Sequence, residues 1–128
     1  MTQIRDYRPE DFERVTEIYQ TKGYEFALPD LTNPLMVVRK VLADNEDRVT
    51  MAAFGRLHIN AMLFVDGALG TPEERLTNVV ALQNEAMAAA GTLGLDIATT
   101  QMEGRFAERM AAMGWVKGWG EMFYRRIP

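Results

Sequence analysis

Apolar side chains recur every three or four positions in four parts of the chain, which predicts four helices. These helices are expected over residues 9–22, from residue 33 to about 41, over 72–90 and over 105–113. Gly23 follows the first helix and Gly114 the last, and glycine just past a helix is a common stop because it adopts left-handed backbone angles without strain. In the last helix, Phe106, Met110 and Met113 share one face, which we expect to point inward.

Runs rich in β-branched and aromatic residues predict strands between and after these helices. They cover residues 3–7, 48–57, 58–65, 95–99, 115–119 and 122–127. The second and third runs follow each other closely, so we expect them to pair as antiparallel strands. The polar stretch at residues 44–47 predicts a turn before them. This order of elements indicates a single α/β (α+β) domain, spanning residues 1–128, with a mixed central sheet.

Composition narrows the classes of function. The 128 residues carry a net charge of -4, contain no cysteine and include His58 as the only histidine. Disulfides, thiolate zinc sites and metal sites built on several histidines are therefore excluded. A negative chain has no basic surface for nucleic acid, and no apolar run is long enough to cross a bilayer. We expect a cytoplasmic protein that binds neither nucleic acid nor membrane.

The clearest local motif is Thr71-Pro72-Glu73-Glu74, at the start of the long helix. A threonine followed three residues later by a glutamate is typical of a capping box, in which each side chain accepts a hydrogen bond from the backbone N–H of the other residue. Proline is also favoured at the first helical position. We therefore expect the helix to begin with its first N–H groups already satisfied.

Three stretches resemble the GNAT superfamily of acyl-CoA-dependent N-acetyltransferases. The opening run Ile4-Arg5-Asp6-Tyr7-Arg8-Pro9-Glu10-Asp11-Phe12 is similar to the family's first strand and the start of its first helix. The runs at residues 52–55 and 62–65 resemble its third and fourth strands, and residues 106–115 resemble its last helix and the glycine-aromatic pair that follows. The resemblance implies a GNAT-like fold: a mixed, mostly antiparallel sheet flanked by about four helices.

The resemblance also implies acetyl-CoA as the cofactor and a small-molecule amine as the acceptor. The family holds acetyl-CoA between its fourth and fifth strands, and glycines in the next loop let the backbone receive the pyrophosphate at a helix N-terminus. The positions that this implies for cofactor binding are Leu63, Val65, Gly70 and Thr71. The loop pattern [QR]-x-x-G-x-[GA] falls here on Gly70, Glu73 and Arg75, which places negative charge where the pyrophosphate would lie.

The expected catalytic position departs from the family as well. The family often has a tyrosine four residues before the glycine-aromatic pair, where it protonates the departing thiolate, and that position here is Met110. Tyr124 is an alternative phenol from the last predicted strand. Glu25 is a candidate acceptor-site residue and base, because the loop between the first two helices lines the substrate side in the family. A solvated loop glutamate is the competing interpretation.

Two hypotheses of function follow, with a small-ligand binder that uses the same strand opening as a third. The chain is either a divergent acyl-CoA-dependent N-acyltransferase or a non-catalytic GNAT-fold binding or assembly module that does not bind CoA. The fold resemblance favours the first, and the residues at the motif positions favour the second. Trp115 and Trp119 alternate on a predicted strand. They are consistent with a homodimer contact or with burial against the last helix.

Overall fold

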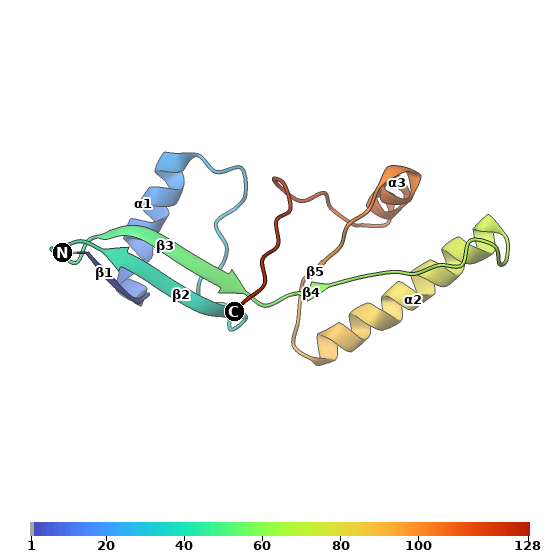
Figure 1. Cartoon of the computed structure of the whole chain (residues 1–128), viewed down its shortest axis with the longest axis horizontal. Coiled ribbons are helices and arrows are strands. Elements are labelled where there is room, and N and C mark those ends of the chain that lie inside the picture. The colour runs from blue at the N-terminus through green and yellow to red at the C-terminus, as the bar shows by residue number, and fades with distance from the viewer. Residues whose placement is uncertain (1) are drawn as a thin grey trace. The chain divides into compact units, whose positions relative to one another are not determined.

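The computed structural model describes residues 2–128 and is a mixed α+β structure (Figure 1). Over these residues it has three α-helices, a short 3-10 helix, a three-stranded sheet and a two-stranded sheet. The chain divides into two compact units. Unit 1 comprises Met1–Leu31, Lys40–Ala52 and Met102–Pro128, and unit 2 comprises Thr32–Arg39 and Ala53–Gln101.

The three-stranded sheet has the order β1-β2-β3, with β1 at Gln3–Asp6, β2 at Met36–Ala43 and β3 at Val49–Arg56. β1 pairs antiparallel with β2, so that Gln3 lies opposite Ala43 and Asp6 opposite Lys40. The predicted turn between β2 and β3 is confirmed. The carboxylate of Asp44 accepts the N–H groups of residues 46 and 48, which closes the turn without burying a polar group.

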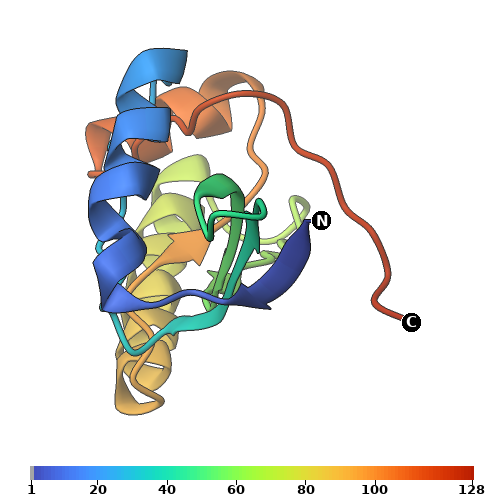
Figure 2. The same ribbon diagram turned by 90° about the vertical axis from the view of Figure 1, so that its left-hand side faces the viewer.

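The first predicted helix is confirmed, with a 3-10 turn, η1, at Pro9–Asp11 leading into α1 at Phe12–Lys22. Gly23 ends it with φ of 66°, as expected for a left-handed stop. Figures 1 and 2 show α1 beside the part of this sheet that belongs to unit 1. The Nε of Arg14 donates to the carbonyl oxygen of Val49 at 3.0 Å, which joins α1 to β3. The buried apolar residues of unit 1 are Val15, Leu31, Val41, Ala43, Val49 and Met110.

The helix predicted from residue 33 is wrong, because this segment forms strand β2. Asn33 starts a turn instead: its side-chain oxygen accepts the N–H of Leu35, and its carbonyl oxygen accepts the N–H of Met36. Asparagine forms such turns readily, because its side chain can accept a hydrogen bond from the backbone two residues later. Beyond the turn, the β-branched valines at positions 37, 38 and 41 favour a strand, since their χ1 rotamers are restricted in a helix.

Unit 2 contains a βαβ arrangement. β4 at Ile59–Asn60 pairs in parallel with β5 at Ala98–Thr99, and α2 at Pro72–Thr92 connects the two strands. The predicted antiparallel pairing of residues 48–57 with 58–65 is therefore wrong: β3 pairs with β2, and β4 pairs with β5. Residues 56–58 lack tight-turn chemistry, whereas a helical crossover allows the next strand to pair in parallel.

The last helix, α3, spans Gly104–Ala112, close to its predicted bounds. Met110 is fully buried as expected, but Met113 is 48% exposed and does not point inward. The two closing strands predicted at residues 115–119 and 122–127 are not formed, although the structure describes this whole segment. Phe123 and Tyr124 are 85% and 94% exposed. A β-rich sequence forms a strand only when a neighbouring strand accepts its backbone hydrogen bonds, so propensity alone misleads here.

The fold class is thus confirmed as mixed α+β, with an antiparallel sheet and a small parallel pair in place of one continuous sheet. The described residues form three α-helices against the four expected, because the second expected helix is β2. Over residues 2–128, no helix combines the length and the apolar character needed to cross a membrane. The single domain expected from chain length stays a prediction.

Candidate functional site

The connection from β4 to α2, residues 61–71 of unit 2, holds the positions that the family resemblance assigns to the cofactor. At its start, the backbone N–H of Ala61 donates to Thr99 at 2.7 Å, and the hydroxyl of Thr100 donates to the carbonyl oxygen of Ala61 at 2.9 Å. Further on, the carboxylate of Asp66 accepts the N–H of Ala68 at 2.9 Å. The connection is therefore hydrogen-bonded to the β5 region at its start and forms a local turn at Asp66 before α2.

The capping box at the start of α2 is confirmed in full. The hydroxyl oxygen of Thr71 accepts the N–H of Glu74 at 3.1 Å, and the carboxylate of Glu74 accepts the N–H of Thr71 at 3.1 Å. Pro72, at the first helical position, has no N–H to offer. Two backbone donors that an anion would use at a helix N-terminus are thus already bound to side chains of the protein.

The carboxylate of Glu74 also lies directly over Gly70. A methyl group built on Gly70 would lie 2.9 Å from Glu74 Oε2. The guanidinium of Arg75 binds the loop backbone: its Nη1 donates to the carbonyl oxygens of Leu69 at 3.0 Å and of Gly70 at 2.8 Å. One nitrogen of this guanidinium is thus engaged by the loop backbone. The pyrophosphate of acetyl-CoA does not fit this helix end.

The residues predicted for the site are divided between the two units. Leu63, Val65, Gly70 and Thr71 all lie on the connection in unit 2. The predicted strand at 58–65 shortens to Ile59–Asn60, so Leu63 and Val65 lie outside the strand. Leu63 is half-buried and Val65 is 50% exposed.

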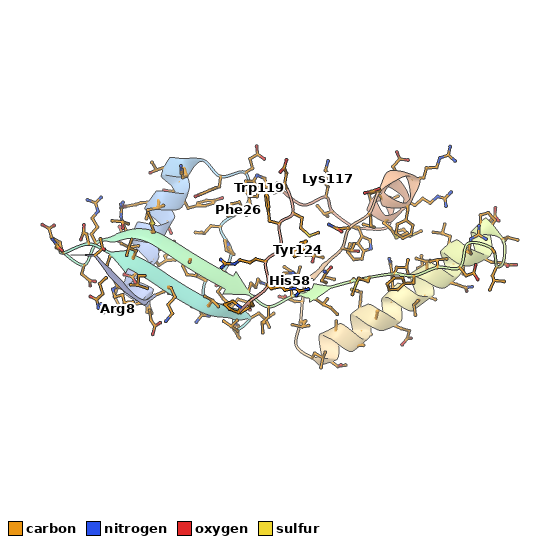
Figure 3. The ribbon with its side chains drawn as sticks, viewed as in Figure 1. Arg8, Phe26, His58, Lys117, Trp119 and Tyr124 are labelled. Atoms are coloured by element: carbon orange, nitrogen blue, oxygen red, sulfur yellow. The ribbon has the colours of Figure 1, made fainter. Side chains whose placement is uncertain are left out.

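The two candidate catalytic residues belong to unit 1. Glu25 is exposed in the segment after α1, and Tyr124 is 94% exposed near the C-terminus (Figure 3). Met110, at the family's general-acid position, has no exposed surface. A buried thioether has no proton to donate, so this position cannot act as an acid.

An ion-pair network holds the start of the chain in unit 1. Both terminal nitrogens of Arg5 donate to the carboxylate of Asp11, at 2.8 and 2.9 Å, and its Nε donates to Asp47 at 2.9 Å. Arg8, at the lower left in Figure 3, adds its backbone N–H to Asp11 and a side-chain contact of 3.2 Å to Asp47. The Arg5 guanidinium, followed by the Arg8 N–H, holds the pKa of Asp11 below its ordinary value. The network connects β1, η1 and the β2–β3 turn, which is a structural role.

Four aromatic rings gather elsewhere in unit 1, and the sequence reasoning did not bring them together. Tyr19 comes from α1, Tyr24 and Phe26 from the segment after it, and Trp119 from the C-terminal segment. Neighbouring ring centroids are 5.0 to 5.9 Å apart. Figure 3 shows Phe26 and Trp119 side by side. The only signal in the sequence was the spacing of Tyr24 and Phe26 around Glu25, because nothing local links them to a residue some 90 positions later.

The comparisons bring no further assignment to either unit. Over residues 2–128, no group of three or more histidine, cysteine, aspartate or glutamate side chains is placed to hold a metal ion. Comparison of the chain with protein-family models, with curated proteins and with solved structures gave no match in any of the three.

Proposed function

We propose that the chain is a divergent GNAT-type domain that has lost the pyrophosphate site for acyl-CoA and serves as a non-catalytic binding or assembly module. The observation that carries the proposal is the Glu74 carboxylate, which lies over Gly70 and accepts the N–H of Thr71. Two like charges about 4 Å apart repel by about 1 kcal/mol in water and about 4 kcal/mol near a protein surface. An anion at this helix end meets that repulsion and also loses a donor.

The state of Met110 supports the same proposal. It stands at the position where the GNAT family often carries a tyrosine acid, and it is fully buried. Its thioether cannot protonate a thiolate leaving group. Cofactor binding and proton donation are thus both weakened by the residues present, and either loss alone would slow acyl transfer.

A second candidate is a divergent acyl-CoA-dependent N-acyltransferase, with acetyl-CoA as cofactor and a small-molecule amine as acceptor. The parallel β4–β5 pair connected by α2 favours it, because this arrangement is similar to the scaffold that carries the cofactor in the family. For this candidate, the positions for the pantetheine arm are Leu63 and Val65, both in unit 2. The roles of Tyr124 as acid and Glu25 as base remain predictions from the family resemblance.

Calorimetric titration of the full chain with CoA, acetyl-CoA and pantetheine tests both candidates. We expect no binding of CoA or acetyl-CoA at millimolar concentration to the wild type. Binding in the micromolar range, or thiol release from acetyl-CoA that depends on an added amine, would overturn the module and support the transferase. The variant Glu74→Ala is the matched probe of the site, because it removes the carboxylate while leaving the Thr71 cap in place.

The assembly form of this proposal includes a homodimer that uses Trp119, which is 56% exposed. Light scattering over a range of protein concentrations should then show dimers, and Trp119→Ser should weaken them more than Trp115→Ser. A monomer at every concentration would restrict the proposal to a binding module. A cytoplasmic location is part of the proposal and rests on the cysteine-free composition.

A further inference from the structure

The aromatic cluster of unit 1, formed by Tyr19, Tyr24, Phe26 and Trp119, is a surface feature and not a sealed core. Tyr24, Phe26 and Trp119 keep 41%, 36% and 56% of their surface exposed. The side chains come from three separate segments, so the tertiary structure has to gather them. Burial in a core would have covered rings of this size, since large aromatic side chains supply much of the energy of a core.

The polar group of Tyr19 faces into the cluster. Its hydroxyl donates to the backbone carbonyl oxygen of Phe26, which fixes the segment after α1 against the helix. Tyr19 and Tyr24 are stacked with an angle of 20° between ring planes, and Trp119 meets Phe26 at 62°. The ring contacts and the hydrogen bond of Tyr19 therefore hold the cluster together.

We propose that this aromatic cluster binds a quaternary ammonium group through cation–π contacts. A cation is attracted to the negative face of an aromatic ring when it lies within about 6 Å of the ring centroid. Neighbouring rings of the cluster lie 5.0 to 5.9 Å apart, so a cation that settles over the face of one ring has a second ring close by.

Two acidic residues lie close to the cluster along the chain. Glu25 lies between Tyr24 and Phe26 in the chain and is exposed, and Glu121 follows Trp119 by two residues. Lys22 and Lys117 are the nearby cations along the chain, and the side chain of Lys117 points away from the Phe26–Trp119 pair (Figure 3). A primary ammonium is strongly hydrated, whereas a methylated one loses less hydration when it settles on a ring. The site thus favours a quaternary ammonium ion over a lysine-like amine.

This inference does not rest on the proposed function. A quaternary nitrogen has no N–H bond for an acyl group to replace, so the site is one of binding and not of transfer. The group can be carried by a free small molecule such as choline or by a trimethylated lysine side chain. Both sources present the same trimethylammonium head to the rings.

Saturation-transfer NMR on the full chain tests the site with choline, with N-acetyl trimethyl-lysine amide and with 3,3-dimethylbutan-1-ol, the uncharged counterpart of choline. We expect saturation to pass from aromatic protons to the methyl groups of a trimethylammonium probe, with half-saturation at millimolar concentration, and a weaker effect for the alcohol. The tighter of the two charged probes identifies the source. If neither charged probe binds, or if the alcohol binds as well as choline, the proposal is overturned.

Matched variants locate the binding. Trp119→Leu should weaken choline binding roughly two- to fivefold, the loss expected for one exposed cation–π contact. Phe123→Leu, a second exposed aromatic on the same segment, should leave it unchanged. Glu25→Gln should keep the fold because its side chain is exposed, and it should weaken the binding of choline but not that of the alcohol. Glu85→Gln on α2 should leave the binding of both probes unchanged. Unchanged binding in both Trp119→Leu and Glu25→Gln would refute the assignment.

Discussion

Replacing Glu74 by alanine tests whether the capping box closes the N-terminus of α2. The change removes the carboxylate that accepts the N–H of Thr71 at 3.1 Å, while the reciprocal bond from the Glu74 N–H to the threonine oxygen remains. Glu73→Ala is the matched control: it removes a neighbouring charge from the same helical turn. Both variants lose the favourable interaction of a carboxylate with the helix dipole, and only Glu74→Ala also loses the hydrogen bond.

The expected magnitudes follow from these contacts. Loss of a charge near the helix start costs about 0.3–1 kcal/mol, and loss of an exposed capping hydrogen bond adds about 1 kcal/mol. The free energy of unfolding should therefore fall by about 0.5 kcal/mol in Glu73→Ala and by about 1.5 kcal/mol in Glu74→Ala. Urea denaturation followed by far-UV circular dichroism measures both, with an unchanged slope as the sign that only stability has changed.

The opposite effect is expected for anion binding. Glu74→Ala removes the repulsion over Gly70 and frees the Thr71 N–H, so inorganic pyrophosphate should bind this variant several-fold more tightly than it binds Glu73→Ala. Gly70→Ala provides an internal check, because its methyl group would lie 2.9 Å from Glu74 Oε2. Its cost should be smaller in the Glu74→Ala background than in the wild type. Equal losses of stability in Glu73→Ala and Glu74→Ala, with no change in pyrophosphate affinity, would refute the claim that Glu74 blocks anion binding at the N-terminus of α2.

Two further predictions concern unit 1 and the β2–β3 pair. Asp11→Asn should lower the free energy of unfolding by about 1–2 kcal/mol at pH 7, because Arg5 loses a charged acceptor. The pKa of Asp11 is lowered in the folded chain, so the contribution of its carboxylate to the free energy of unfolding is complete above the ordinary carboxyl pKa and is lost as the pH falls below about 4. The free energies of unfolding of the wild type and Asp11→Asn, measured by urea titration, should therefore converge in acid. Gly55→Ala should cost about 1 kcal/mol, because the new methyl would lie 3.0 Å from Val38 Cβ, which no rotamer change can move. The added methyl in Gly67→Ala meets nothing within 4 Å, so this variant should be neutral or slightly stabilising in the same urea denaturation. An equal loss in both glycine variants would contradict the packing argument.

Local chemistry explains why some elements could be predicted closely. The capping box at Thr71 is complete within four residues, so its geometry needs no partner from elsewhere in the chain. The same holds for Gly23 after α1 and for Asp44 in the β2–β3 turn, whose carboxylate bonds the backbone two and four residues later. For the candidate site, the unfavourable charge at the start of α2 was therefore visible before the structure.

The errors arose where the outcome depends on distant parts of the chain. Residues 36–43 form a strand and β4 pairs with β5 because of the strand edges that these segments meet in the folded chain. A hydrophobic pattern does not encode which edge a segment meets.

The sequence by itself determined the capping box at the N-terminus of α2, because its hydrogen bonds join residues only three positions apart. Only the tertiary structure decided the parallel β4–β5 pair, the network of Arg5 with Asp11 and Asp47, and the meeting of Tyr19, Tyr24, Phe26 and Trp119. Each of these joins residues that are far apart along the chain or come from different elements. Such contacts stabilise the fold only once the chain between them has been ordered, which costs conformational entropy, so no local sequence pattern predicts them.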